Sequence, residues 1–253
     1  NEAHQRGMQV HALLGSMHLK TWEYILPEKR QDAVQMVRNV LDYNAGSNAS
    51  EMFDGFNVDI EPYILPGWGS DQPYYAKLFL ETLSAQKQLI GSYGQSMQFG
   101  PCVPRWYDNQ YNVSAVEWNG QVKPLYQHVQ DMSEYISIMD YRNIASSIIL
   151  DAMAELQYAD SIGRKVVIGV ETGESEEGPW VSFYGYTEEE MEAVLAAARD
   201  GVSGIPGLDS FASFDGLAIH HYSSYAAMAV PEPASILLLG SGLSGLFFFV
   251  RKR

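Results

Sequence analysis

Six short apolar runs constrain the fold of this chain more than any other feature of its sequence. Each run is nearly continuous in apolar character, which is typical of β-strands that are covered on both faces. Such strands belong to parallel sheets, where helices pack against the sheet. The runs span residues 8–14, 56–60, 97–103, 135–139, 166–170 and 217–219.

Helical patterns separate several of these runs. Pro27 is well placed to open a helix, because its fixed backbone suits the first helical turn. Thr187 and Glu190 form a capping-box pattern ahead of another apolar stripe. The expected buried helix faces contain Ala33, Val37, Val40 and Leu41; Tyr75, Leu78, Phe79 and Leu83; Ile149, Met153 and Leu156; and Met191, Val194, Leu195 and Ala198.

Alternating strands and helices predict an α/β fold with a parallel sheet. An open doubly wound sheet is one alternative, but no glycine-rich phosphate loop follows any strand. Polar residues gather where the strands end, which favours a (β/α)8 TIM barrel. About six of its eight strands can be identified, so we predict a barrel over residues 1–229 that lacks its first strands. We expect about two further βα units and a signal peptide to precede Asn1.

Charge and cysteine content exclude several classes of function. The formal net charge is −15, and the body before residue 230 carries 13 basic and 30 acidic residues. This acidic balance argues against a nucleic-acid partner, which would require clustered Lys and Arg. The single cysteine, Cys102, excludes an intrachain disulfide and a cysteine-rich metal site. We predict no cofactor and no metal.

The segment Asp-Gly-Phe-Asn-Val-Asp-Ile-Glu-Pro-Tyr, residues 54–63, carries the most specific chemical signal. Side chains alternate along a strand, so Asn57, Asp59 and Glu61 are expected to point to one side. Val58 and Ile60 then face the helix layer. Carboxylates that point into a barrel are costly unless they are paired or used. Two neighbouring acids raise each other's pKa, which suits a general acid.

This segment resembles the family 18 glycoside hydrolases, the chitinase-like enzymes, whose fourth strand carries Asp-x-x-Asp-x-Asp-x-Glu. The match falls on Asp54, Asp59 and Glu61, with Asn57 in place of an Asp. The resemblance implies that Glu61 protonates the leaving oxygen and that Asp59 orients the acetamido group of the substrate. That acetamido group itself attacks the anomeric carbon, the substrate-assisted exception among glycosidases.

Two later segments match the same family in part. Met-Asp-Tyr-Arg at residues 139–142 resembles the Met-x-Tyr-Asp of the sixth strand, which implies that Tyr141 holds the acetamido oxygen. Arg142 departs from that pattern. At the eighth strand, Ala-Ile-His-His-Tyr at residues 218–222 stands where the family has a tryptophan floor. The residues expected to bind substrate are Asp54, Asn57, Arg105, Trp106, Asp140, Arg142, His220 and Tyr222.

A second catalytic arrangement competes with the first. Glu171 directly follows the apolar run 166–170. The clan A glycosidases resemble this order, with an acid/base Glu after the fourth strand and a nucleophilic Glu after the seventh. Carboxyl groups about 5 Å apart at Glu61 and Glu171 would then give a retaining double displacement. The Asn-Glu pair usual before the clan A acid is absent, because Ile60 precedes Glu61.

Two weaker candidates complete the set. Arg105, Trp106 and Tyr107 follow the run 97–103 and are placed to clamp a sugar and stack against it, although an ordinary surface loop would look the same. His220 and His221 are adjacent, so at most one of them points inward in a strand. A zinc site formed by this pair is therefore not expected.

The last residues form a tail unlike the body. Val-Pro-Glu-Pro-Ala-Ser at 230–235 precedes an uncharged apolar stretch that continues to residue 250, followed by Arg-Lys-Arg. At about 1.5 Å per residue, this stretch nearly crosses a hydrocarbon core of about 30 Å. The basic end favours the cytoplasmic side. A buried core helix is the alternative, and it would require the basic terminus to pack beside apolar surface.

The tail also resembles the PEP-CTERM sorting signal, because a Pro-Glu-Pro motif, a short apolar helix and a basic cluster follow in that order. The resemblance implies recognition by an exosortase-type enzyme, cleavage near Pro231, and export to the cell envelope or an extracellular matrix. We therefore predict a second unit at residues 230–253, a sorting signal with a transmembrane helix that holds the protein at the membrane at least transiently.

Two functions from different classes remain open at this stage. The first is a glycoside hydrolase that acts on extracellular polysaccharide, with Glu61 as general acid. The second is a catalytically silent barrel that binds glycan in the matrix. The departures at Asn57, Arg142 and His220 favour the second, and the Asp59–Glu61 pair favours the first. Fold resemblance alone cannot separate them.

Overall fold

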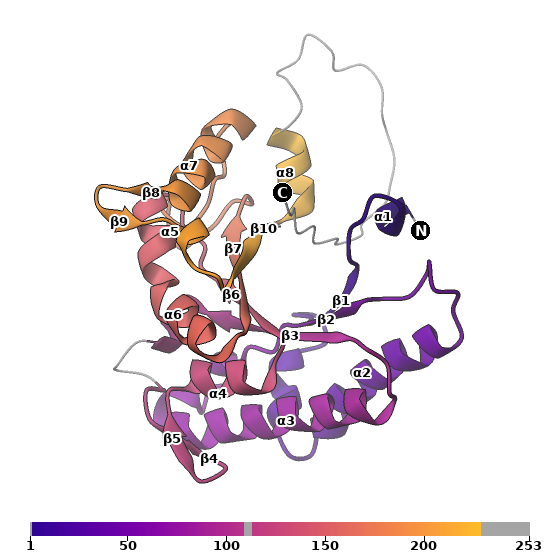
Figure 1. The fold of residues 1–253 in the computed structure, drawn as a ribbon. Coiled ribbons are helices and arrows are strands. Elements are labelled where there is room, and N and C mark those ends of the chain that lie inside the picture. The colour runs from indigo at the N-terminus through magenta and orange to yellow at the C-terminus, as the bar shows by residue number, and fades with distance from the viewer. Residues whose placement is uncertain (1, 109–112, 229–253) are drawn as a thin grey trace.

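The computed structural model describes residues 2–108 and 113–228 and contains one parallel sheet covered by helices (Figure 1). Each of the six predicted apolar runs contains a strand of this sheet, so the predicted strands are confirmed. The strands are β1 His11–Leu14, β2 Gly55–Val58, β3 Gln98–Pro104, β6 Tyr135–Met139, β7 Lys165–Glu171 and β10 Phe214–His220. Two short hairpins lie outside the sheet: β4 Val116–Trp118 with β5 Gln121–Lys123, and β8 Gly201–Val202 with β9 Ile205–Pro206.

Helices connect the strands of the main sheet. The α-helices are α1 Glu2–Gln5, α2 Arg30–Ala45, α3 Gln72–Ser92, α4 Leu125–Met132, α5 Ala145–Asp151, α6 Met153–Ile162, α7 Glu188–Asp200 and α8 Tyr222–Met228. The 3-10 helices are η1 Thr21–Ile25, η2 Pro62–Ile64, η3 Trp68–Ser70, η4 Arg105–Asp108 and η5 Leu208–Ser210.

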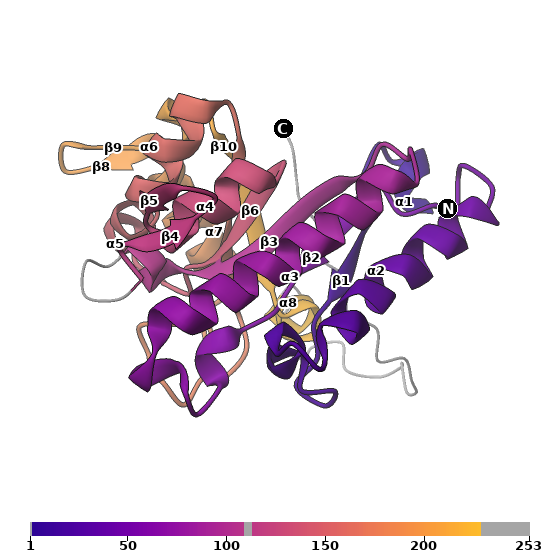
Figure 2. The ribbon, with the colours of Figure 1, turned by 90° about the horizontal axis from the view of Figure 1, so that it is seen from below.

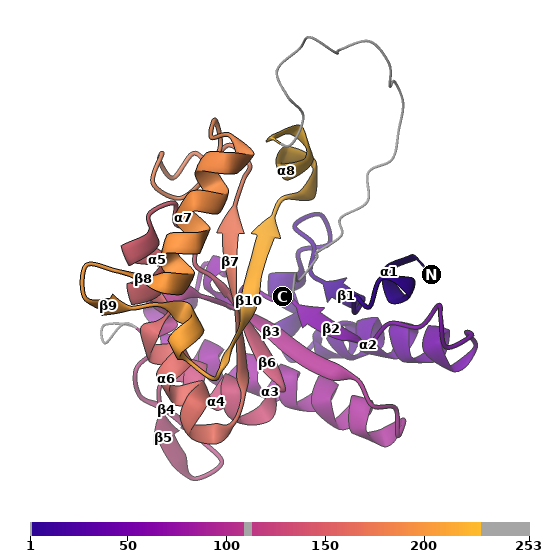
Figure 3. The same cartoon turned by 45° about the horizontal axis from the view of Figure 1, so that its top comes forward.

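The sheet is a curled half-barrel. Its strand order is β1-β2-β3-β6-β7-β10, and every neighbouring pair is parallel. Figure 3 shows the sheet curling so that β10 turns back toward β1. Within the described residues these two end strands do not pair with each other. The α/β class and the parallel sheet are therefore confirmed, and the described sheet has six strands where a closed TIM barrel has eight.

The helices cover the convex face of the sheet in two groups. Seen from below, α2 and α3 lie side by side along β1, β2 and β3 (Figure 2), and the Gln86 side chain ties them by donating to the Ala33 carbonyl at 3.0 Å. The second group, α4 to α7, flanks β6, β7 and β10 (Figure 1). The predicted stripe with Ile149 and Leu156 spans two helices, because α5 ends at Asp151 and α6 begins at Met153.

The core lies between the convex face and these helices. Val58, Ile60, Ile138 and Ile168 are buried there against the helix layer. The concave face is different, because only Tyr135, Val167 and Ala218 form a small buried cluster on it. Close packing on one face and sparse packing on the other leave space inside the curl, and the candidate site occupies that space.

The predicted tail at residues 230–253, with its transmembrane helix, lies outside the described residues. Within the part of the chain that the structure describes, none of the helices combines the length and the apolar character needed to span a bilayer.

The capping box at the start of α7 provides a direct test of local sequence control. The Thr187 hydroxyl accepts from the Glu190 amide at 3.2 Å, and Glu190 Oε2 accepts from the Thr187 amide at 2.8 Å. We predict that Thr187→Ala lowers the free energy of unfolding by about 0.5–2 kcal/mol. Thr187→Ser, which keeps the hydroxyl, should stay close to wild type. Urea unfolding followed by circular dichroism measures both, and equal stability of the two variants would contradict the role of the cap.

Candidate functional site at the carboxyl ends of the strands

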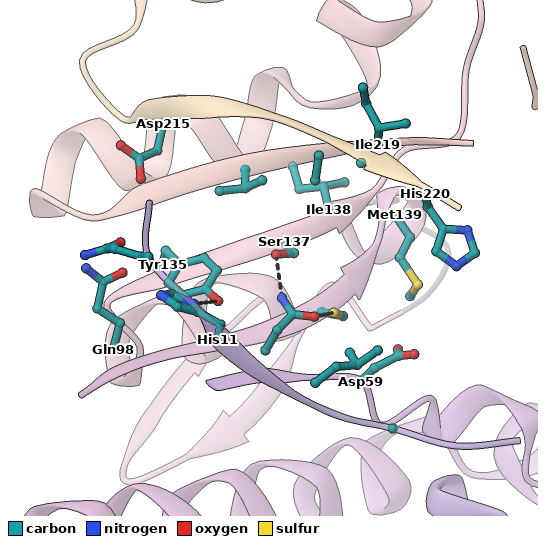
Figure 4. A pocket seen from close by; sticks show the side chains of 18 of the residues that line it. His11, Asp59, Gln98, Tyr135, Ser137, Ile138, Met139, Asp215, Ile219 and His220 are labelled. Carbon is teal, nitrogen blue, oxygen red and sulfur yellow. Dashed lines mark hydrogen bonds between the residues drawn. The ribbon is translucent and has the colours of Figure 1, made fainter. Parts of the chain in front are cut away.

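A cavity of about 1020 Å³ opens on the concave side of the half-barrel. Figure 4 shows that it has two ends: Asp59, Met139 and His220 lie at one, and His11, Gln98 and Asp215 lie at the other. The first end is formed by residues that close β2, β6 and β10, the carboxyl ends of the strands. Sites of barrel enzymes lie at this end of the sheet. Of the residues predicted from sequence, the cavity wall contains Asn57, Asp59, Glu61, Tyr141 and His220.

The row of polar residues on β2 follows from strand alternation. Asn57, Asp59 and Glu61 all line the cavity, whereas Val58 and Ile60 are buried against the helices. The strand ends at Val58, but the alternation continues through Ile60 before Pro62 starts η2. A carboxamide and two carboxyl groups are thus carried into the cavity along one edge of a single segment.

Asp59 is the most perturbed of these acids. Its Oδ1 is fully buried and accepts no hydrogen bond from the described residues. Burial, reinforced by the neighbouring Glu61 charge and opposed by His220, raises the Asp59 pKa to about 6. A carboxyl group with this pKa changes its charge close to neutral pH, which suits proton transfer.

Gly15 permits the close approach that buries Asp59. The Asp59 amide donates to the Leu14 carbonyl at 2.9 Å, which extends the β1–β2 pairing past the end of both strands. A Cβ at residue 15 would lie 2.5 Å from the Asp59 carbonyl oxygen and 2.6 Å from its Cβ. Only glycine therefore fits beside Asp59 without displacing it.

Glu61 is held by an aromatic neighbour that the sequence analysis did not select. The η2 turn brings the Tyr63 hydroxyl back onto Glu61, where it donates a hydrogen bond to Oε1. Burial and the Glu61 charge raise the pKa of Tyr63, so it remains a neutral donor. Tyr63 in turn contacts Trp106 at a centroid distance of 5.0 Å. A Tyr two residues after the acid, beyond a Pro, was the signal for this contact.

Asn57 belongs to a hydrogen-bonded chain across the sheet. Its amide nitrogen donates to Ser137 Oγ at 2.9 Å, and the Cys102 thiol donates to its amide oxygen at 3.1 Å. Burial raises the pKa of the Cys102 thiol well above its ordinary value. Cys102 is buried, as expected, but it also contributes to the cavity wall. Asn57 thus fills a position where an Asp would be a further buried charge.

Tyr141 is held in the cavity by an unusual backbone conformation. Its φ of 41° is in the left-handed region, and its amide donates to the Gly169 carbonyl at 3.1 Å. A Cβ at residue 169 would meet the Ile138 carbonyl oxygen at 2.9 Å, so Gly169 leaves the space that β6 and Tyr141 require. The Tyr141 ring stacks on His220, with centroids 5.9 Å apart and planes 28° apart.

Glu171 and His220 form an ion pair across the ends of β7 and β10. The strand register places them opposite each other, and His220 Nδ1 lies 2.5 Å from Glu171 Oε2. The other oxygen, Oε1, accepts from the backbone amides of Thr172 at 2.8 Å and Gly173 at 2.5 Å. Burial raises the Glu171 pKa, but these hydrogen bonds and the His220 charge outweigh burial, so the pKa is lowered overall.

Asp54 lies at the opposite end of β2 from Glu61. Its Oδ2 accepts from the Val10 amide at 2.7 Å and lies 2.9 Å from His4 Nε2. These contacts join the start of β2 to the segment that leads into β1. Asp54 therefore connects two backbone segments and is not part of the cavity wall.

Arg105, Asp140 and Arg142 come together, but outside the cavity wall. Tyr135, Ser137 and Met139 face the cavity, so strand alternation turns Asp140 toward the helices. Arg142 Nε and Arg105 Nη1 both approach Asp151 Oδ2, at 2.9 and 3.4 Å. Trp106 packs on Tyr63, and Tyr222 is 46% exposed at the start of α8. The structure does not place these side chains on the cavity wall beside Glu61.

The far end of the cavity contains polar residues that the sequence analysis did not select. Tyr135 donates its hydroxyl hydrogen to the Phe56 carbonyl at 2.9 Å and lies 2.7 Å from His11 Nδ1. Burial lowers the pKa of His11, although Asp54 and Asp215 oppose this shift. A Cβ at Gly100 would lie 1.9 Å from the Tyr135 ring, so glycine is required there. No sequence motif marked this cluster, because its members come from separate strands.

The tail has a match among protein families. Residues 229–253 match the PEP-CTERM protein-sorting motif. The motif marks the chain as an exported protein sorted to the cell envelope and implies recognition by an exosortase-type enzyme. The chain has no significant match among curated proteins.

Several solved structures are similar to the body at low sequence identity. Catalytic domain 2 of the Ostrinia furnacalis Group II chitinase is 13% identical, with a TM-score of 0.38 over 70% of this chain and 50% of its own. The spore cortex-lytic enzyme SleL of Bacillus megaterium QM B1551 is 14% identical, with a TM-score of 0.37 over 64% of this chain and 35% of its own. A family 18 N-acetylglucosaminidase from Paenibacillus barengoltzii is 13% identical, with a TM-score of 0.33 over 65% and 60%. The chain thus spans about half the length of these structures.

Two acids beside the site are buried without partners. Asp140 and Glu155 have no exposed surface, and neither carboxyl group makes a hydrogen bond with any described residue. Burial raises both pKa values well above the ordinary range, and the nearby charge of Asp151 adds to each shift. Both groups therefore retain protons that the unfolded chain would release near pH 4.

This arrangement predicts a protein that loses stability as the pH rises. Each acid stabilises the fold fully below its unfolded pKa, and this contribution falls by about 1.4 kcal/mol per pH unit until the folded pKa is reached. Asp140→Asn and Glu155→Gln, which are neutral at every pH, should flatten the decline between pH 4 and 7. Thermal unfolding across that range measures the slope. The exposed Glu176→Gln is the control, and equal slopes in all variants would contradict protonated burial.

Proposed function

We propose that the protein is an exported glycan-cleaving enzyme of the chitinase-like kind, with Glu61 as general acid and Asp59 as its partner. The observation that carries the proposal is the Asp59–Glu61 pair on the wall of the large cavity at the carboxyl ends of the strands. The Asp59 pKa of about 6 indicates that the pair is poised to hold a proton near neutral pH. The sorting motif supports a substrate outside the cytoplasm.

The proposed reaction is substrate-assisted hydrolysis of a β-linked N-acetylated sugar. Glu61 donates its proton to the glycosidic oxygen as the bond to the anomeric carbon breaks. The carbonyl oxygen of the neighbouring acetamido group attacks that carbon and forms a cyclic oxazolinium ion. Glu61 then accepts a proton from a water molecule, which opens the ring and releases the sugar.

The cavity provides groups for each of these steps. Asp59, adjacent to Glu61 on the wall, is positioned to accept the acetamido N–H as its positive charge develops. Tyr141 is a neutral donor for the acetamido oxygen, because burial raises its pKa. Tyr63 orients Glu61 through its hydroxyl. Asn57 lines the wall below Asp59 without adding a charge.

A glycan-binding protein without catalysis is the second candidate, and two observations favour it. The Tyr63 hydroxyl already occupies one oxygen of Glu61. Arg142 is bound to Asp151 and lies outside the cavity wall. The double displacement with Glu61 and Glu171 has less support, since both Glu171 oxygens accept hydrogen bonds from the protein.

Substitution of the three acids separates these functions. We expect Glu61→Gln to lower turnover by about 10²- to 10⁴-fold, because an amide cannot deliver the proton, and to leave sugar binding nearly intact. Asp59→Asn should also impair turnover. Glu171→Gln should not abolish turnover under substrate assistance, but should match the Glu61 change under double displacement. The assay is hydrolysis of N-acetylated and non-acetylated oligosaccharides by the full protein, with calorimetry for binding.

Two outcomes would redirect the assignment. If the wild type cleaves neither substrate class and yet binds one, the enzyme proposal fails and the binding protein replaces it. If it cleaves only non-acetylated sugars and requires Glu171, the double displacement replaces substrate assistance. Glu176→Gln, in the exposed loop between β7 and α7, should behave as wild type in every assay.

A further inference from the structure

The Glu171–His220 pair is built so that the imidazole, and not the carboxylate, faces the cavity. The side chain of Glu171 is 14% exposed and that of His220 is 31% exposed. Among the described residues, His220 contributes to the cavity wall and Glu171 does not. Figure 4 shows His220 at the same end of the cavity as Asp59. A ligand in the cavity would therefore meet a histidine whose orientation is fixed from behind by a carboxylate.

Three contacts fix the position of this imidazole. The short Nδ1–Oε2 contact joins it to Glu171, which the amides of Thr172 and Gly173 hold in turn. The Tyr141 ring stacks on one face of His220, with centroids 5.9 Å apart. A carboxylate that orients a histidine through Nδ1 assigns proton exchange to the rest of the ring, as in other histidine-based sites.

The charged groups around His220 come from every strand end at this side of the cavity. Glu171 closes β7, Asp59 and Glu61 follow β2, and Tyr141 follows β6. The neighbouring His221 ring lies at a centroid distance of 5.8 Å. The His220 charge lowers the pKa of Asp59, against the larger effects of burial and of Glu61. His220 and Asp59 thus influence each other's charge within one cavity.

We propose that His220 is a third proton-carrying group of the site, which exchanges a proton with the Asp59–Glu61 pair, and that Glu171 is its positioning residue. A proton that leaves the imidazolium is taken up by the Asp59 carboxylate, giving a neutral imidazole and a neutral acid. The reverse transfer restores the ion pair. Its consequence for turnover rests on the function proposed above, but the coupling of the two groups does not.

The test is a ¹³C NMR titration of the Asp59 carboxyl group in the full protein. His220→Phe keeps a ring to stack on Tyr141 but removes the charge, so the Asp59 pKa should rise by about one unit above its value of about 6. Glu171→Gln removes the carboxylate that stabilises the imidazolium, so Asp59 should shift in the same direction by less. His221→Phe, the adjacent histidine, is the matched control and should leave the titration unchanged.

The outcomes separate this inference from the proposed function. An unchanged Asp59 titration in folded His220→Phe and Glu171→Gln overturns the inference, whether or not the protein cleaves sugars. A shifted titration without hydrolysis supports the inference and overturns only the enzyme. If hydrolysis occurs, the acidic limb of kcat/KM should move to higher pH by the same amount, because Asp59 is protonated earlier. If His220→Phe does not fold, His220→Gln serves for the same measurement.

Discussion

Two carboxyl groups held next to each other in a partly desolvated cavity are the constraint on which the rest of this site depends. Asp59 and Glu61 cannot both carry an unshielded charge there without a large cost. The surroundings offset that cost through the Tyr63 hydroxyl on Glu61 and the His220 charge near Asp59. The sparse packing of the concave face leaves the cavity, and Gly15 lets β1 approach closely enough to bury Asp59.

Strand positions were predictable because burial on two faces leaves a continuous apolar run. The same reasoning carried the alternation at residues 57–61, since a period of two is fixed by the backbone. That period also shows why Asp140 was misplaced as a cavity residue: Met139 faces inward, so its neighbour must face the helices. A motif read as a string hides this distinction, but a strand register reveals it.

Contacts between strands could not be predicted in the same way. The Glu171–His220 pair depends on the register between β7 and β10, which a bulge near Phe214 shifts by one residue. The Tyr63–Glu61 bond depends on the short η2 turn after Pro62. Arg105 and Arg142 pair with Asp151 because α5 ends beside them. Each of these contacts joins segments whose relative position no local pattern encodes.

A crystal structure of the Glu61→Gln protein with an N-acetylated oligosaccharide tests the central claim most directly. The account predicts a sugar in the cavity, with its glycosidic oxygen beside residue 61 and its acetamido group between Asp59 and Tyr141. His220 should remain paired with Glu171 in that complex. A sugar bound elsewhere on the protein, or a cavity that stays closed to sugar at saturating concentration, would contradict the account.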